Sequence, residues 1–197
     1  MIVRSDNGAA TAVQNIVGDG SLVALAHRAR MRHFSAAAIW GSTLISAADQ
    51  SRFFLRLGRL LPRRHRAYAL RLLASVVPEQ RWGIATLRFP GWRLHFKGGW
   101  GSGSGAVDHQ VALLRHRGGL RVALAVLTRG SPSAAYARET QRGVAARLLR
   151  RLRPRAERWR RKGRSGVRRF WGTVSTKVVE PRRVGLRQAP GASRAAE

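Results

Sequence analysis

The residue with the clearest chemical signal in this chain is Lys97. Of the 38 lysine and arginine residues, 35 are arginine, and Lys97 is the only lysine in residues 1–150. It stands just ahead of Gly98 and Gly99, at the end of a strand-like segment. Lysine places a compact charge on a thin stem, whereas arginine presents a broad planar fork. A lysine at this position of an arginine-rich sequence favours a site whose geometry admits only an ammonium group. The alternative is that one lysine falls there by chance.

Three polar residues near the N-terminus, Ser5, Asp6 and Asn7, precede a helix-like stretch. Ser-Asp-Asn, a later strand ending in Lys-x-Gly and an earlier Ser-x-x-Lys form the three-part signature of class A β-lactamases and penicillin-binding proteins. The second and third parts are present here in that order, the third at Lys97. On these residues the chain resembles this serine hydrolase superfamily. The alternative is that Ser5 and Asp6 only cap the following helix.

The resemblance implies that the motif residues act on an amide bond, in a β-lactam or in a peptide of the D-Ala-D-Ala type. Ser5 would relay a proton to the leaving nitrogen, and Lys97 would polarise Ser5 and attract the substrate carboxylate. Asn7 would hydrogen-bond the side-chain amide of the substrate, and Asp6 would be buried and fix its loop. The implied partner is therefore a small-molecule β-lactam or peptide, with no cofactor.

The resemblance also assigns roles to the residues that follow Lys97. Gly98 and Gly99 would let the strand edge approach the ligand closely, and the backbone N–H of Trp100 would supply one donor to an oxyanion hole. Gly98 stands where the family usually has threonine, so one hydroxyl contact to a substrate carboxylate is missing. The alternatives are that the two glycines mark a bulge and that Trp100 belongs to the core.

The nucleophile motif of the superfamily is absent from this chain. No Ser-x-x-Lys occurs, because the residues three places before the lysines are Leu94, Trp159 and Val174. Without that serine there is no acyl-enzyme, and half of the oxyanion hole is missing. Residues 20–48 also lack the glutamate that drives deacylation in class A β-lactamases. We therefore expect a truncated or degenerate hydrolase that is inactive as written; either its start is assigned too late, or the gene is truncated.

No metal site is expected. The six histidines include no pair at helical metal-ligand spacing with a carboxylate between them. Asp108 and His109 are neighbours, but adjacent side chains of a strand face opposite ways, so we interpret both as structural. The absence of cysteine excludes a disulfide, a zinc–thiolate cluster and a thiol nucleophile.

The net charge of +29 raises a second hypothesis. Residues 1–150 hold 23 basic and 6 acidic residues (+17), and residues 151–197 hold 15 and 3 (+12), so the excess is spread along the chain. A coding bias toward arginine explains such a spread, because a binding protein concentrates its charge on one face. The alternative is a basic protein that binds nucleic acid or an anionic membrane through residues 151–171, where arginines alternate with Trp159, Phe170 and Trp171.

The length of 197 residues and the 44% hydrophobic content fit one globular domain with a real core. No apolar run approaches the length of a membrane span, and the N-terminus carries no export signal. The resembled family is typically exported or periplasmic, whereas the chain as written is expected in the cytoplasm. The location therefore stays open.

The periodicity of apolar residues predicts an α+β fold, in which an antiparallel sheet packs with helices as an incomplete serine β-lactamase-like (DD-peptidase) fold. We expect one domain over 1–153 and an arginine-rich, disordered tail over 154–197. Within the domain, 1–78 is expected to be mainly helical, 79–130 to form strands and 131–153 to form a terminal helix.

Caps and breakers place the individual elements more closely. The helix after Leu61 is expected to bury Tyr68, Leu72 and Val76, and the terminal helix, opened by Ser131 and Pro132, to bury Ala137, Val144, Leu148 and Leu152. The predicted helices before it cover 8–17, 21–31 and 46–60, with Phe53, Phe54 and Leu57 in the core. The predicted strands cover 82–89, 92–97, 107–115 and 120–128, the last two joined at Gly118 and Gly119.

Overall fold

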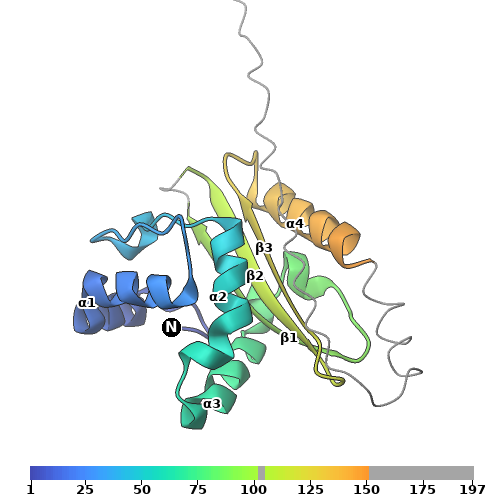
Figure 1. Ribbon diagram of the computed structural model, residues 1–197. Helices are drawn as coiled ribbons and strands as arrows, with labels where there is room; N and C mark the ends of the chain where they lie inside the picture. Colours follow the sequence, from blue (N-terminus) through green and yellow to red (C-terminus); the bar gives the residue numbers. More distant parts are fainter. Residues whose placement is uncertain (102–104, 151–197) are drawn as a thin grey trace, which may run out of the picture.

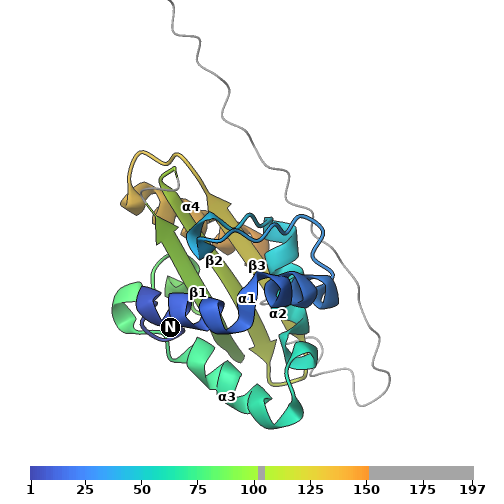
Figure 2. The same ribbon diagram turned by 90° about the vertical axis from the view of Figure 1, so that its left-hand side faces the viewer.

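The sheet of this protein has helices on both faces (Figure 1). The computed structural model describes residues 1–101 and 105–150. In this part of the chain, α4 covers one face of a three-stranded antiparallel sheet, and α1, α2 and α3 lie on the other (Figure 2). The helices are α1 (Asn7–Ala29), α2 (Ala47–Leu60), α3 (Arg63–Ala74) and α4 (Ala134–Leu149), and the strands are β1 (Trp92–Gly101), β2 (Val107–His116) and β3 (Arg121–Thr128). Short 3-10 helices are η1 (Trp40–Ser42), η2 (Pro78–Gln80) and η3 (Gly83–Thr86).

On the face opposite α4, α1 and α2 lie close to the helices that the sequence predicts. α1 contains two helical segments joined at Gly18, whose φ of 70° leaves the helical region, so the predicted break is confirmed. α2 begins after Ser46, whose side chain accepts a hydrogen bond from the Asp49 N–H, as expected for a capping box. Phe54 and Leu57 of α2 are buried, as predicted.

The strands pair in the order β1-β2-β3, so among the described residues β1 and β3 are the sheet edges. The register of β1 with β2 runs without interruption from Trp92 opposite His116 to Gly101 opposite Val107. Alternate residues face opposite sides, which divides the core in two. One half of the core lies between the sheet, η3 and α4. It includes Ile84, Phe96, Leu114, Ala145 and Leu149. The other half lies between the sheet, α2 and α3, and it includes Phe54, Leu57, Leu73, Val111 and Leu113.

Residues 82–89 do not form the predicted strand. Gly83 has a φ of 57° and opens η3. The buried side chain of Gln110 on β2 satisfies the backbone there, accepting from the Ile84 N–H at 2.7 Å and donating to the Trp82 carbonyl at 2.6 Å. Because a side chain supplies these hydrogen bonds, the segment needs no partner strand.

The apolar stripes of the last two helices are displaced from the predicted positions. On α3, Tyr68 is 55% exposed, and the buried residue is Leu73. Val76 is buried as expected, but it lies beyond the end of α3 at Ala74. On this face the neighbouring leucines, rather than the tyrosine, pack against the sheet.

The terminal helix begins two residues later than predicted. Ser133, not Ser131, caps α4, and its Oγ accepts the Tyr136 N–H at 3.1 Å. Ala137 is buried as predicted, but Leu148 is exposed and Leu149 is buried in its place. Leu152 and the predicted tail over 154–197 lie outside the described residues.

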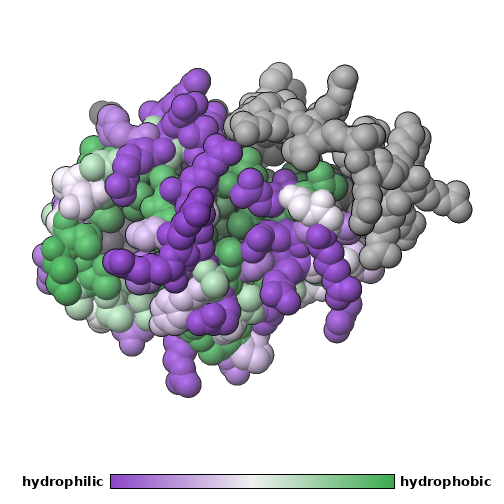
Figure 3. All heavy atoms as spheres, turned by 60° about the horizontal axis from the view of Figure 1, so that its bottom comes forward, coloured by the Kyte–Doolittle hydropathy of each residue, from purple (hydrophilic) through white to green (hydrophobic). Residues whose placement is uncertain are grey.

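The surface is mostly hydrophilic on the face shown in Figure 3, with hydrophobic residues gathered where α1 lies. Val13, Ile16, Val17 and Val23 of α1 are among the exposed large apolar residues. None of the described helices combines the length and the apolar character that crossing a membrane requires.

Candidate functional site

Ser5 and Lys97, separated by 92 residues in the sequence, meet at the free edge of β1. The Lys97 ammonium donates a hydrogen bond to Ser5 Oγ and another to the carbonyl oxygen of Gly98. Ser5 Oγ in turn donates to Gln80 Oε1 at 2.9 Å. Burial lowers the pKa of Lys97. The contact therefore joins a polarised hydroxyl to a partly desolvated cation, a pair suited to anion binding and to proton transfer.

The segment before α1 is fixed against η2, which positions the Ser5 hydroxyl. The Val77 N–H donates to the Val3 carbonyl at 3.1 Å, and Gln80 Nε2 donates to the Arg4 carbonyl at 2.9 Å. Ser5 itself has a φ of 53°, an uncommon left-handed conformation for a residue with a side chain. Figure 2 shows the start of α1 beside β1, where this contact forms.

The backbone of β1 points alternately toward β2 and toward the free edge. The His116 N–H donates to the Leu120 carbonyl across the β2–β3 turn, and the Arg117 N–H donates to the Gly91 carbonyl on the β1 side. Even-numbered residues of β2 thus bond to β3, and odd-numbered ones bond to β1. Lys97 and Gly99 pair with odd-numbered residues, so the N–H and carbonyl groups of Gly98 and Trp100 face away from the sheet. The Gly98 carbonyl accepts the hydrogen bond from Lys97 there, and the N–H groups of Gly98 and Trp100 point to the same edge.

The two glycines differ in what surrounds them. A Cβ added at Gly98 would lie 3.2 Å from the Trp82 ring, so this glycine lets the tryptophan cover the strand. A Cβ at Gly99 would meet nothing within 4 Å. The uninterrupted register excludes the bulge that the sequence left open. Trp100 is 48% exposed, so the alternative that it belongs to the core is wrong.

Asp6 and Asn7 are exposed at the start of α1. Asp6 Oδ1 accepts a hydrogen bond from the Ala9 N–H at 2.7 Å and so caps the helix. The expectation that Asp6 is buried is therefore wrong, because its carboxylate is satisfied by the helix terminus at the surface. Asn7 opens the helix close to Ser5 in the sequence.

Asp108 and His109 lie outside the Ser5–Lys97 contact. Asp108 is 6% exposed, and Arg138 Nε of α4 lies 3.8 Å from its Oδ1. His109 stands opposite Gly99. Burial lowers the pKa of His109, against hydrogen bonding and charge from Asp108 that raise it. In residues 1–101 and 105–150, no three His, Cys, Asp or Glu side chains gather as metal ligands would.

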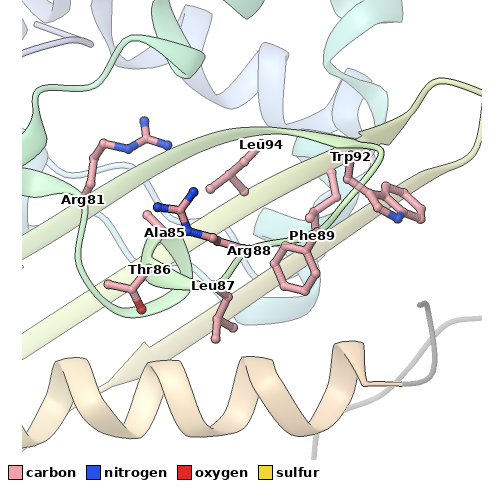
Figure 4. A pocket seen from close by; sticks show the side chains of 9 residues that line it. Arg81, Ala85, Thr86, Leu87, Arg88, Phe89, Trp92 and Leu94 are labelled. Carbon is pink, nitrogen blue, oxygen red and sulfur yellow. The ribbon is translucent and has the colours of Figure 1, made fainter. Parts of the chain in front are cut away.

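A separate hollow of about 350 Å³ lies between β1 and the 81–89 segment (Figure 4). Arg81, Phe89, Trp92 and Leu94 are among its lining residues, and Figure 4 shows α4 running below it. None of the predicted site residues lines it.

Sequence reasoning missed three side chains that surround the site: Gln80, Trp82 and Arg138. Gln80 binds Ser5, and the Arg138 guanidinium lies 4.5 Å from the centre of the Trp82 ring. None belongs to a motif, and Trp82 falls in the segment wrongly predicted as a strand. Only the assembled fold brings them to β1.

Comparison with known proteins gives one family match and several structural matches. The family model described as "Beta-lactamase enzyme family" matches residues 1–152. The chromosome-encoded β-lactamase of Vibrio parahaemolyticus is similar in structure, with a TM-score of 0.67 and 13% identity over 77% of this chain and 62% of that one. A β-lactamase from Desulfarculus baarsii has a TM-score of 0.60 and 25% identity, over 73% of this chain and 60% of its own. No curated protein matches the sequence.

A third similar structure is PBP-A, with a TM-score of 0.60 and 20% identity over 76% of this chain and 59% of its own. A variant of PBP-A has been solved as an acyl-enzyme complex with penicillin G. This chain thus spans 62% or less of the length of the solved structures described. The matches confirm the predicted α+β fold and its partial extent.

Proposed function

We propose that this chain, which belongs to the β-lactamase enzyme family, binds carboxylate-bearing amides of the β-lactam or D-Ala-D-Ala type at the edge of β1. The observation that carries the proposal is the hydrogen bond from Lys97 to Ser5. Two residues of separate family motifs meet there, and the outward backbone groups of Gly98 and Trp100 lie next to them.

The charge at Lys97 supports a carboxylate as the ligand group. Within the described part of the chain, no carboxylate lies within 4.0 Å of its ammonium, whose partners are a hydroxyl and a carbonyl. A partly buried cation without a counter-ion carries a desolvation cost. A bound carboxylate would offset that cost, so this site favours an anionic ligand.

The parent reaction gives each group a role that its position allows. Ser5 would pass its proton to the leaving nitrogen and be reprotonated through Lys97, while the Trp100 N–H would donate to the carbonyl oxygen as negative charge develops there. Asn7 would hold the amide side chain of the substrate. Acylation needs the serine of Ser-x-x-Lys, which these 197 residues do not contain. We therefore propose binding without turnover for the chain as given.

Replacing Lys97 by arginine tests the proposal. We expect Lys97→Arg to weaken binding of penicillin G at least tenfold, as Lys97→Ala does, because the planar fork does not fit a site shaped for an ammonium. In the unchanged protein, affinity should fall as the pH rises through the lowered pKa of Lys97, since the neutral amine no longer attracts the carboxylate. Isothermal titration calorimetry measures both effects.

Arg93→Lys is the matched control, because it makes the reverse exchange at an exposed position of the same strand. It should leave the affinity unchanged. Mass spectrometry should detect no covalent adduct with penicillin G. Equal affinity in the Lys97→Ala variant and the unchanged protein would contradict the proposed site.

A further inference from the structure

Trp100 presents an exposed aromatic surface beside the ammonium of Lys97. Trp100 is 48% exposed, and the centre of its ring lies 5.9 Å from Lys97 Nζ. An exposed tryptophan side chain presents a large apolar surface to water. Among residues 1–101 and 105–150, no carboxylate pairs with this ammonium, so a ligand held there through its carboxylate would lie against the ring.

The ring of Trp100 is held in place rather than loosely attached. Trp82 meets it edge to face, with ring centres 6.0 Å apart. The ring of Trp82 lies over Gly98, and the Arg138 guanidinium lies 4.5 Å from the centre of that ring. The backbone carbonyl of Trp82 accepts a hydrogen bond from the Gln110 side chain. An aromatic surface fixed from behind loses little conformational entropy when a ligand binds.

From this geometry we infer that Trp100 is a specificity-determining residue: it forms a subsite for an aromatic side chain on the carbon that bears the ligand's carboxylate. The inference rests on the proposed function, since Lys97 must first hold that carboxylate. The distance between the ring and the ammonium restricts contact to groups near the carboxylate. A peptide that ends in an aromatic D-amino acid has such a group, whereas one that ends in D-alanine has only a methyl group.

Two dipeptides separate the subsite from the anchor. Acetyl-D-Ala-D-Phe should bind about 2- to 10-fold more tightly than acetyl-D-Ala-D-Ala, the range expected for one additional aromatic pair. Trp100→Ala should reduce the ratio of the two affinities to about one, because it removes the ring but keeps the backbone N–H, and Trp100→Phe should keep part of the preference. Calorimetry at fixed pH measures the affinities, and circular dichroism checks that the variants fold.

Tyr68→Ala provides the control, because it removes another exposed aromatic side chain, 55% exposed on α3. It should leave the preference intact. If both dipeptides bind equally and Lys97→Ala abolishes the binding of both, the subsite is wrong and the proposed function stands. If neither binds, the proposed function itself fails. A D-Phe preference that survives Lys97→Ala would also overturn the inference, since the ring would then act without the carboxylate anchor.

Discussion

Ser5 has a hydroxyl in contact with Lys97 and a backbone with positive φ. One substitution alone would not show which of these two properties causes its effect. A side chain in the left-handed region costs about 1 kcal/mol or more, whereas glycine has no such cost. We expect Ser5→Ala and Ser5→Gly to weaken penicillin G binding equally. Ser5→Gly should nevertheless be more stable than Ser5→Ala by about 1 kcal/mol, as measured by chemical denaturation.

Comparing the two variants separates the hydroxyl from the backbone. Equal loss of affinity in both would assign the effect to the hydroxyl. If Ser5→Gly bound penicillin G as well as the unchanged protein, the Ser5 hydroxyl would have no part in binding.

At this scale the sequence could predict that Ser5 and Lys97 lie together, but not what surrounds them. Ser5 and Lys97 are recognisable because their motifs are local strings of residue types. Gln80 and Trp82 have no such string, because their contacts with Ser5 and Gly98 arise only when distant segments fold together. The exposure of Asp6 could not be predicted for the same reason, since it depends on which segments pack over the start of the helix.

Asp49 ties the loop after α1 to the start of α2. It is fully buried, accepts hydrogen bonds from the N–H groups of Arg32 and His33 at 2.8 and 2.7 Å, and is bound by Ser46 and Arg52. Burial alone would raise the pKa of Asp49, but these hydrogen bonds outweigh it and leave the pKa lowered. The carboxylate is therefore stabilised in the folded protein.

Asp49→Asn should destabilise the protein by about 3 kcal/mol at neutral pH, because an amide cannot replace all four interactions. A carboxylate whose pKa is lowered by folding contributes stability above its unfolded pKa, and that contribution is lost as the pH falls through the folded value. The difference between variant and unchanged protein should therefore shrink in acid. Urea unfolding at several pH values measures it.

Glu139→Gln is the control, since Glu139 and Arg142 form a pair with the same spacing at the exposed surface. It should hardly change stability at any pH. A difference for Asp49→Asn that stayed constant into acid would contradict the assigned role of its charge.

Elements with local signals could be predicted from the sequence, whereas those fixed by distant side chains could not. The Ser46 cap, the Gly18 break and the hairpin at Gly118 and Gly119 follow from neighbouring residues. The 82–89 segment looks extended, but the side chain of Gln110 turns it into η3. Which leucine of α4 is buried depends in the same way on the sheet beneath it.

The whole molecule is expected to consist of a folded domain over 1–153 and a separable segment over 154–197. Deleting 154–197 should leave the thermal unfolding temperature and the affinity for acetyl-D-Ala-D-Ala unchanged, because every contact assigned to the site lies in residues 1–150. Calorimetry measures both. A large loss of either would place part of the domain in the deleted segment.

The same deletion distinguishes the rival hypothesis of a nucleic-acid-binding protein. If residues 151–171 were the functional element, affinity for single-stranded DNA would fall steeply with salt and vanish on deletion. We expect instead that both forms bind DNA weakly at physiological salt and that DNA leaves dipeptide binding unchanged. Fluorescence anisotropy across a salt series measures the binding of DNA, and calorimetry with and without DNA measures the binding of the dipeptide.

Nuclear magnetic resonance of the labelled protein with acetyl-D-Ala-D-Ala tests the proposed site most directly. Because the N–H groups of Gly98 and Trp100 face the free edge and those of Lys97 and Gly99 bond to β2, we expect the larger backbone amide shifts at Gly98 and Trp100. Saturable shifts confined to these residues and Ser5 would support binding at the edge of β1. Shifts spread over the arginine-rich surface, or none at Gly98 and Trp100, would contradict it.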